Sequence, residues 1–243
     1  IEKILSSLPY EFVVTINGDH SISEYLLDYK FDYIFFTGST AVGKYVMGKA
    51  AANMIPVSLE LGGKSPCVVA ADARLDFAAK RIAWGKFYNA GQMCISPDYV
   101  LIDRRIKDRF LELISLEIAK FYGEDPEQSG DFPRVINPLK AERLAYLMKA
   151  GTIITGGKTN PETCYVSPTV ISDVKPSDPI MNEEVFGPVL PVIEFENIEE
   201  IYDYFYDSET GSVEDAIEEL GEENFSEEEI RLIRIKFLAE MAN

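Results

Sequence analysis

The first 58 residues alternate between short apolar runs and amphipathic segments. The β-branched run at residues 11–16 and the apolar run at residues 31–36 predict two strands, the second of them buried. Residues 21–29 between them have helical spacing, as do residues 1–8, and a further helix is expected to continue to Met54. This order is typical of a parallel α/β sheet that binds nucleotides, of which only a part is present.

The same alternation predicts a second α/β unit, which begins at residue 58. Strands are predicted over residues 57–61, 66–70, 98–102, 165–171 and 189–195, and helices over residues 75–88, 103–123 and 138–150. Asp103 is expected to cap the second of these helices, whose apolar face is core. The predicted fold class is therefore α/β in both units.

The last part of the chain, residues 208–243, has a different composition. From Asp203 onward the sequence has 13 acidic residues and three basic ones. The net charge of this segment, 3 − 13 = −10, is more than half of the total net charge of −18. Ser212 can cap a helix over residues 213–220, and Ser226 with Glu229 makes a capping box for a helix over residues 230–241. This acidic helical tail is expected to pack on the body of the protein, on a second copy or on a partner protein.

Composition and charge exclude several classes of function. A net charge of −18 argues against nucleic acid or an anionic membrane as a partner, since both require a basic surface. No apolar run has membrane-spanning length and no signal peptide opens the chain, so a soluble, cytoplasmic protein is expected. The three cysteines have no metal or disulfide spacing, which favours a reducing compartment and predicts no metal site.

Cys94 is the candidate nucleophile. It follows the small, flexible run Asn89-Ala-Gly-Gln92 at the end of a helical pattern and precedes Ser96-Pro97, which blocks a continuing helix. On such a tight connection, nearby backbone N–H groups can favour a thiolate and later hold an oxyanion. The alternative is a packing cysteine, and Asn89 and Gln92 are expected to shape the loop rather than react.

Glu60 is the candidate general base. It is an isolated carboxylate in the apolar run Leu59-Glu-Leu-Gly-Gly-Lys64, where loss of water would suit it to take up a proton near neutral pH. Lys64 and Lys86 are interpreted as surface or packing lysines without a role.

A glycine turn, Gly38-Ser-Thr-Ala-Val-Gly43, connects a predicted strand to a helix. Backbone amides in such a turn approach a phosphate group, and the helix dipole adds to the attraction. Gly38, Gly43 and Lys44 also fit most of a P-loop, but Tyr45 occupies the position of the Mg²⁺-binding Ser or Thr, so a P-loop phosphohydrolase is disfavoured. A simple helix cap by Ser39 or Thr40 is the other interpretation.

A third shaped loop, Glu183-Glu-Val-Phe-Gly-Pro188, precedes the strand at residues 189–195. If this segment is extended, the side chains of Glu184 and Phe186 project on the same side. A carboxylate there can accept hydrogen bonds from two vicinal hydroxyl groups at once.

These segments occur in the order of the signatures of the aldehyde dehydrogenase superfamily. The sequence resembles that superfamily at Phe36-Thr-Gly-Ser-Thr-Ala-Val-Gly-Lys44, at the run around Glu60, at Asn89-Ala-Gly-Gln-Met-Cys94 and at Glu183-Glu-Val-Phe-Gly-Pro188. Arg81-Ile-Ala-Trp-Gly-Lys86, Pro97-Asp-Tyr99 and Phe121-Tyr-Gly-Glu-Asp125 are most similar to its class 3, fatty-aldehyde branch. The resemblance covers about residues 1–205 and does not include the acidic tail.

The resemblance implies an oxidoreductase that uses NAD or NADP to oxidise an aliphatic or aromatic aldehyde to a carboxylic acid. Cys94 would form a thiohemiacetal and then a thioester, and Glu60 would activate the water that releases the acid. The implied cofactor-binding residues are Gly38, Ser39, Gly43, Leu61, Glu184 and Phe186. The implied organisation is a partial NAD(P)-binding, Rossmann-type unit at residues 1–57, a catalytic domain at residues 58–207 and the tail at residues 208–243.

Three features of the family have no counterpart in this sequence. Its asparagine donor to the oxyanion and its lysine on the adenine-side ribose would lie before the region in which the sequence begins, and its C-terminal oligomerisation strand would follow the region in which the resemblance ends. Weak or no turnover is therefore expected of this sequence alone. The alternative function is that of a non-catalytic remnant or interaction protein that uses its acidic helical tail.

Overall fold

The computed structural model describes residues 2–5, 12–196, 203, 212–221, 225, 227, 230, 231, 233 and 234. The chain divides into two compact units, Ile1–Gly62 and Gly63–Asn243. The division therefore follows the strand at Val57–Leu61, which the sequence-based boundary had assigned to the second unit. The reason is that this strand pairs with a strand of the first unit.

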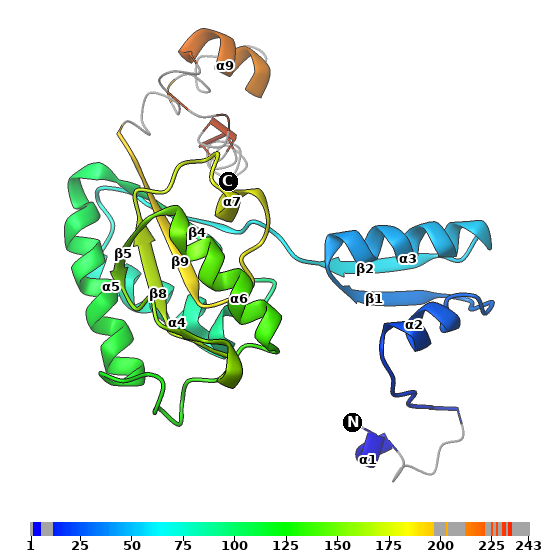
Figure 1. Ribbon diagram of the computed structural model, residues 1–243. Coiled ribbons are helices and arrows are strands. Elements are labelled where there is room, and N and C mark those ends of the chain that lie inside the picture. Colours follow the sequence, from blue (N-terminus) through cyan, green and yellow to red (C-terminus); the bar gives the residue numbers. More distant parts are fainter. Residues whose placement is uncertain are drawn as a thin grey trace. The chain divides into compact units, whose positions relative to one another are not determined.

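Unit 1 consists of a two-stranded parallel sheet and the helices connected to it (Figure 1). Its elements are α1 (Glu2–Leu5), α2 (His20–Leu26), β1 (Ile34–Gly38), α3 (Thr40–Ala52) and β2 (Val57–Leu61). In the register of the sheet, Ile34 lies opposite Val57 and Gly38 lies opposite Leu61. The predicted strand–turn–helix–strand order around the glycine turn is confirmed.

The predicted strand at residues 11–16 is wrong for its described part. The backbone from Val13 to Asp19 has no regular secondary structure, and β1 pairs with β2 alone in the described sheet. Val14 and Ile16 are exposed by 76% and 56%. β-branched residues favour a strand when they pack on a half-buried pleated surface, and here no such surface covers them. β1 is also less buried than predicted, since Phe35 is 67% exposed.

Unit 2 contains a five-stranded sheet in the order β3-β4-β9-β8-β5. All its strand pairs are parallel except β5 with β8. Its elements are β3 (Pro66–Val69), α4 (Leu75–Phe87), η1 (Tyr88–Gly91), β4 (Tyr99–Asp103), η2 (Arg104–Ile106), α5 (Lys107–Tyr122), α6 (Pro138–Leu147), η3 (Met148–Ala150), β5 (Thr152–Thr155), β6 (Thr159–Asn160), η4 (Pro161–Thr163), β7 (Tyr165–Val166), β8 (Thr169–Ser172), α7 (Pro179–Asn182) and β9 (Val189–Phe195). The predicted strands and helices of this unit are confirmed with shifts of a few residues at their ends, except that the strand predicted over residues 165–171 is divided into β7, which pairs with β6, and β8, which belongs to the five-stranded sheet. Asp103 caps η2, the short turn that leads into α5, rather than α5 itself.

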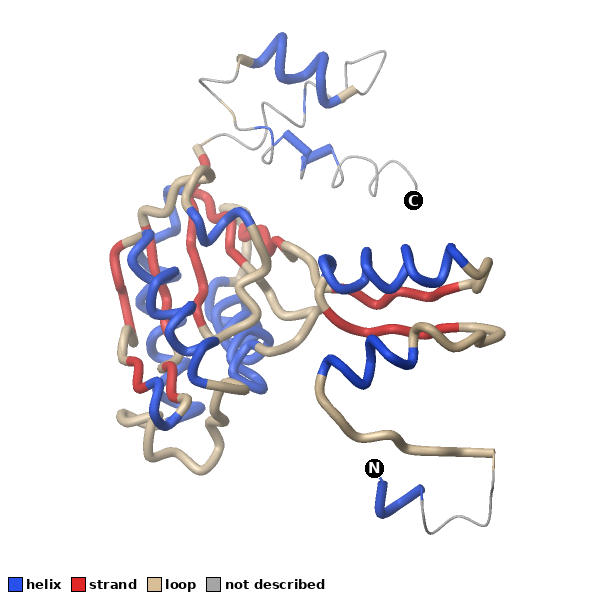
Figure 2. The backbone as a smooth tube through the Cα atoms, turned by 45° about the vertical axis from the view of Figure 1, so that its right-hand side comes forward, coloured by secondary structure: helices blue, strands red, loops and turns tan. Residues whose placement is uncertain are grey.

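Helices cover both faces of this sheet (Figure 2). Val100 and Ile102 of β4 pack with α4 and α5, whereas Tyr99 and Leu101 pack with α6 and α7. Successive side chains of a strand point to opposite faces, so a strand buried on both faces is apolar throughout. All five residues of β4 are buried, which agrees with this pattern.

The N-terminal ends of β3, β4 and β9 lie along the same side of the sheet. β3 pairs with β4 from Pro66 and Tyr99 onward, and β4 pairs with β9 from Val100 and Val192 onward. Because these strands are parallel, the segments that lead into them lie next to one another. These segments are residues 63–65, 92–98 and 183–188, and they contain most of the candidate site residues of unit 2.

The described part of the acidic tail contains α9 (Val213–Leu220). The Ser212 side chain accepts a hydrogen bond from the Asp215 N–H at 3.2 Å, which confirms the predicted cap. Val213, Ala216, Ile230 and Ile233 form a small buried cluster. Most of the helix predicted at residues 230–241 and its capping box at Ser226 lie outside the described residues. Within the described ranges, no helix has the length and apolar character needed to cross a membrane.

Truncation of Phe110 tests the packing of α5 on the sheet. Its side chain is fully buried against α4 and the strands, so Phe110→Ala is expected to lower the free energy of unfolding by about 3–5 kcal/mol. Trp84 is the one tryptophan of the chain and lies on α4, so its fluorescence during urea unfolding reports on unit 2. Leu116→Ala on the same helix is the control, because Leu116 is 53% exposed and its truncation should change stability by no more than about 0.5 kcal/mol. Equal effects of the two substitutions would contradict the packing.

Candidate active site

Cys94 lies on the connection between α4 and β4, at the edge where the chain enters β4. Asn89, Ala90 and Gly91 have φ values of 52°, 52° and 70°, so three consecutive residues adopt left-handed backbone conformations. Only Gly91 does so without steric cost. The strained turn ends α4 and leaves Cys94 exposed.

Gln92 holds this turn in place through its side chain. The amide nitrogen donates to the carbonyl oxygens of Asn89 and Arg134 at 3.1 and 3.2 Å, and the amide oxygen accepts from the Ile136 N–H at 2.9 Å. The Asn89 side chain donates in return to the Gln92 carbonyl oxygen at 3.2 Å. The predicted loop-shaping role of Gln92 and Asn89 is confirmed.

Cys94 differs from the other two cysteines in its accessibility. Among the residues that the structure describes, neither its thiol nor its backbone N–H makes a hydrogen bond, so both are available to a ligand. Cys67 and Cys164 are partly buried, and burial raises the pKa of the Cys67 thiol, which makes its thiolate less accessible. The geometry therefore favours Cys94 as the nucleophile of unit 2.

The segment that contains Glu184 and Phe186 packs against the turn before Cys94. A Cβ atom on Gly91 would lie 2.3 Å from the carbonyl oxygen of Gly187, so the two backbones touch at a position that only glycine can occupy. Phe186 has a φ of 44°, so the chain turns there and the segment is not extended. The prediction that Glu184 and Phe186 project on the same side as in an extended segment is corrected accordingly.

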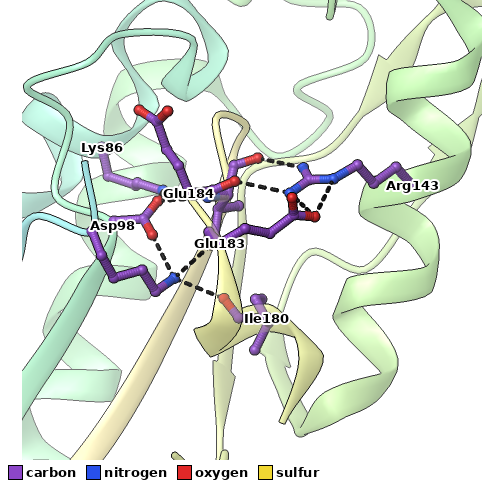
Figure 3. Close-up of polar contacts among 8 residues, drawn as sticks. Lys86, Asp98, Arg143, Ile180, Glu183 and Glu184 are labelled. Atoms are coloured by element: carbon purple, nitrogen blue, oxygen red, sulfur yellow. Dashed lines mark hydrogen bonds and ion pairs between the residues drawn. The ribbon is translucent and has the colours of Figure 1, made fainter. Parts of the chain in front are cut away.

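Asp98 is the centre of a group of charged side chains near these two loops (Figure 3). Asp98 is buried, and its carboxylate accepts from the Lys64 ammonium at 2.5 Å and from the Val185 N–H at 2.9 Å. Lys64 also donates to the carbonyl oxygen of Ile180 at 2.7 Å. Lys86 lies 3.9 Å from Asp98, and Glu184 completes the group through its electrostatic contacts with the other three.

Lys86 has an unusual environment. Its side chain is fully buried, and the distance of 3.9 Å to Asp98 is that of an ion pair but too long for a hydrogen bond. Among the described residues its ammonium group has no hydrogen-bond partner. Burial lowers the pKa of Lys86 to about 8, although Asp98 and Glu184 favour its charged form.

Glu184 is half-buried, and its pKa is raised above the ordinary value. Loss of water is the main cause, and the negative charge of Asp98 adds to it. The Gly63 N–H and the ammonium groups of Lys86 and Lys64 act in the opposite direction. The ionised form of Glu184 is therefore favoured first by the Gly63 N–H and then by the two lysines.

Arg143 of α6 fixes the backbone of the same segment. Its guanidinium donates to the Glu183 carboxylate at 2.7 Å and to the carbonyl oxygens of Glu184 and Val185 at 2.8 Å each (Figure 3). Glu183 is thereby held by Arg143, whereas Glu184 is held among the charges around Asp98. The adjacent glutamates thus have different roles.

In unit 1, the end of β1 and the start of α3 form the predicted glycine turn. Ser39 caps α3, with its hydroxyl oxygen accepting from the Val42 N–H at 3.4 Å. A Cβ atom on Gly43 would lie 2.6 Å from the side chain of Leu61, so the helix approaches the end of β2 closely. Gly38 and Leu61 are neighbours in the sheet. Gly38, Ser39, Gly43 and Leu61 are therefore brought together, which suits a phosphate group at the start of α3.

Glu60 lies on β2 of unit 1, opposite Thr37 in the register. It is exposed, so the loss of water expected from the sequence is not found. The physical reason is the alternation of the strand, which directs Glu60 away from the face on which Leu61 meets α3.

Residues 2–214 match the sequence profile described as the Aldehyde dehydrogenase family. The chain belongs to this family. It is 43% identical over 210 residues to aldehyde dehydrogenase family 3 member A2 of Macaca fascicularis. The aligned region covers 86% of this chain and 43% of that protein. It is 47% identical over 175 residues to the dimeric NADP-preferring aldehyde dehydrogenase of Mus musculus, which covers 72% of this chain and 39% of that protein.

Solved structures of aldehyde dehydrogenases have the same fold. The substrate-bound Staphylococcus aureus AldH is 38% identical with a TM-score of 0.74, over 79% of this chain and 42% of that one. Indole-3-acetaldehyde dehydrogenase in complex with NAD⁺ is 33% identical with a TM-score of 0.67, over 77% of this chain and 40% of that one. The predicted family and its class 3 branch are confirmed. The chain spans less than half the length of these relatives.

Four residues of this candidate site were not predicted from the sequence: Lys64, Lys86, Asp98 and Arg143. Neither lysine is a free surface residue, since Lys64 binds Asp98 and Lys86 is buried beside it, and the packing alternative agrees with the burial of Lys86. One signal was present in the sequence. The buried face of α4 comprises Ala79, Ile82, Ala83, Lys86 and Phe87, so Lys86 occupies a core position of a helical stripe.

Substitution of Gly91 tests the contact between the two loops. Gly91→Ala is expected to lower the free energy of unfolding by more than about 2 kcal/mol, because it combines a left-handed φ with a collision against the Gly187 carbonyl. Urea unfolding followed by Trp84 fluorescence measures the loss. The control is Gly130→Ala, where a Cβ atom meets nothing within 4 Å. A neutral Gly91→Ala variant would mean that the loops are not in contact.

The buried Lys86 predicts a pH dependence of stability. Below pH 8 both the folded and the unfolded chain hold the lysine proton, and the cost of burying the charge is present in full. Between about pH 8 and the ordinary value of 10.5 only the unfolded chain holds it, so folding stability rises with pH. Over this pH range, the free energy of unfolding of wild type minus that of Lys86→Met should therefore rise by on the order of 1 kcal/mol per pH unit. The exposed Lys80→Met on the same helix should leave the wild-type slope unchanged.

Proposed function

We propose that this chain carries out the NAD(P)-dependent oxidation of an aldehyde to a carboxylic acid, with Cys94 as the nucleophile. The observation that supports it most strongly is the exposed Cys94, whose thiol and N–H are both free of hydrogen bonds, on a turn that is locked against the segment of Glu184. The printed names of its relatives are those of aldehyde dehydrogenases, one of them NADP-preferring and one in complex with NAD⁺.

Each unit, taken by itself, has residues that fit one part of a dinucleotide cofactor. Gly38 and Gly43 allow the chain to approach a phosphate at the start of α3, and Ser39 and Leu61 border the same position. Glu184 would accept the hydroxyl groups of the nicotinamide-side ribose, and Phe186 would lie beside the nicotinamide end. NAD or NADP, when bound, supplies the acceptor of the hydride.

Cys94 performs the covalent part of the reaction. Its thiolate attacks the carbonyl carbon of the aldehyde, which forms a C–S bond and moves the carbonyl electron pair onto oxygen. The Cys94 N–H donates to this oxyanion. Loss of the carbon-bound hydrogen as hydride leaves a thioester. The oxygen of a water molecule attacks the thioester carbon, a base takes up the water proton, and the C–S bond breaks to give the acid and the thiolate. Glu60 is the base that the resemblance to the family implies.

Substitution of Cys94 tests this function. The purified chain is incubated with NAD⁺ or NADP⁺ and hexanal, decanal or benzaldehyde, and NAD(P)H formation is followed by absorbance. We expect turnover that Cys94→Ser abolishes and that Cys164→Ser retains, since Cys164 is partly buried. Turnover that persists in Cys94→Ser would contradict the proposal.

A second measurement separates the nucleophile from the cofactor. p-Nitrophenyl acetate can acylate a reactive thiol without a cofactor, so wild type should release a burst of nitrophenol and Cys94→Ser should not. A burst of nitrophenol without aldehyde oxidation would support Cys94 as a nucleophile but contradict the proposed oxidation of aldehydes by this chain. Absence of both activities in folded protein would overturn it.

We further propose a cytoplasmic location and a role of residues 208–243 in binding a second copy or a partner protein. All three cysteines are free, which suits a reducing compartment. α9 carries its apolar residues on one side, next to Ile230 and Ile233, and the charge of the tail favours a partner with a basic surface over nucleic acid. Deletion of residues 208–243 should change the size of the particle in solution if the tail joins two copies.

A further inference from the structure

The outer face of α4 and the residues at its two ends carry an exposed row of aromatic and cationic side chains. These side chains recur about one helical turn apart, on the face opposite the one that packs on the sheet. They are Arg74, Phe77, Lys80, Arg81, Trp84 and Tyr88, and we call this set the α4 stripe. The three aromatic side chains are half-exposed. Large aromatic rings exposed in one row are typical of a surface that binds another molecule.

Contacts within the α4 stripe hold its side chains in place. The guanidinium groups of Arg81 and Arg74 lie 4.4 and 5.8 Å from the centre of the Phe77 ring. The centres of the Trp84 and Tyr88 rings lie 5.5 Å apart. These cation–π and aromatic contacts restrict the side chains before any partner binds, which lowers the entropic cost of docking.

The α4 stripe is basic although the chain as a whole is strongly acidic. Three of its six side chains are cations, and Asp76 on the same helix, 3.5 Å from Arg74, offsets one of them. The whole chain has a net charge of −18. A local excess of positive charge on such a chain attracts acidic segments, including those of other copies of the same protein.

α9 presents a surface complementary to the α4 stripe. Its apolar side is already covered by the cluster that it forms with Ile230 and Ile233. Its opposite side exposes four carboxylates, those of Glu214, Asp215, Glu218 and Glu219. The sequence of α9 contains no lysine or arginine, so this outer side is uniformly negative. The outer surface of α9 is therefore acidic, whereas that of α4 is basic and aromatic.

The two surfaces belong to the same chain, which allows a reciprocal contact between copies. The aromatic side chains of the α4 stripe are exposed within a single chain that includes α9, so they remain available to another copy. Two copies related by a twofold axis can form the contact twice, with each α9 on the stripe of the other copy. Surface ion pairs that are weak individually then act together, because the second contact forms within an already associated pair.

We propose that the α4 stripe is the docking surface for α9 of a second copy of this chain. This inference rests on the proposed role of residues 208–243 in binding a second copy, and it names the basic surface that they bind. The carboxylates of α9 pair with the cations of the stripe, and the aromatic rings between these cations lose their contact with water.

Trp84 reports on the docking directly, because it is the one tryptophan of the chain and lies in the α4 stripe. As the concentration of the full chain rises at low salt, sedimentation should show a dimer and acrylamide should quench the Trp84 fluorescence less. High salt should reverse both changes, since it screens ion pairs at a surface. A monomer at every concentration and salt condition would overturn the proposal.

Charge reversal on either surface tests the pairing. Lys80→Glu with Arg81→Glu, and separately Glu218→Lys with Glu219→Lys, should each weaken the dimer by about tenfold or more, because like charges then face one another. All four side chains are exposed, so both variants are expected to fold, which circular dichroism checks.

The matched control is a charge reversal on α5. Arg109→Glu with Lys120→Glu changes the net charge by the same amount as the variant of the α4 stripe, and both side chains are exposed. This control should keep the dimer. An equal loss of the dimer in the control would mean that net charge alone governs association, which would contradict the proposal.

A mixture of the two charge-reversed variants identifies the occupant of the α4 stripe. In a mixed dimer both contacts again join opposite charges, so the mixture should dimerise although each variant alone does not. The four substitutions combined in one chain should also restore the dimer. Protection of Trp84 in a monomer of that combined variant would mean that α9 docks on its own chain, and it would overturn the proposal.

The same variants separate this inference from the proposed role of the tail. If the substitutions in α9 abolished the dimer and those in the α4 stripe did not, the tail would bind a second copy through another surface. The inference would then fail, while the proposed role of residues 208–243 would stand. None of these measurements involves an aldehyde or a cofactor, so their outcome is independent of the proposed oxidation.

Discussion

The burial of the Asp98 carboxylate is the constraint on which the site in unit 2 depends. A buried carboxylate is stable only when its oxygens are bound, and Asp98 is bound by Lys64 from one segment and by the Val185 N–H from another. Loss of either partner would leave a buried carboxylate oxygen without its hydrogen bond. Asp98 thereby holds three loops together, and Cys94 lies only a few residues before it in the chain.

The position of this site in the sheet explains the unusual turn before Cys94. In open parallel sheets, ligand sites usually lie at the carboxyl ends of the strands, but the loops of Cys94 and Glu184 lead into β4 and β9. α4 must therefore carry the chain back along the sheet to the opposite edge. It ends there without room for another turn, since Gly91 already touches Gly187. The left-handed residues reverse the chain in this small space.

The sequence predicted the elements whose pattern is local and missed the contacts that join distant segments. β4 and β9 are mostly apolar, as expected of strands covered on both faces, and the pattern of α5 is amphipathic over its whole length. The contacts of Lys64 with Ile180 and of Arg143 with Val185 join segments far apart in the chain, so no spacing rule can predict them. The strand predicted at residues 11–16 is wrong for the opposite reason. The local pattern of residues 12–16 favours a strand, but in the described part of the chain no neighbouring strand pairs with it.

The two carboxylates assigned to the reaction have surroundings that suit different tasks. Glu60 is exposed on its strand, where a group that takes a proton from water remains in contact with water. Glu184 is half-buried, and a carboxylate that binds ribose hydroxyl groups must stay ionised even though it is partly shielded. Only the second task requires cations nearby. Lys64 and Lys86 both act on Glu184 in this direction, since their positive charges favour its ionised form.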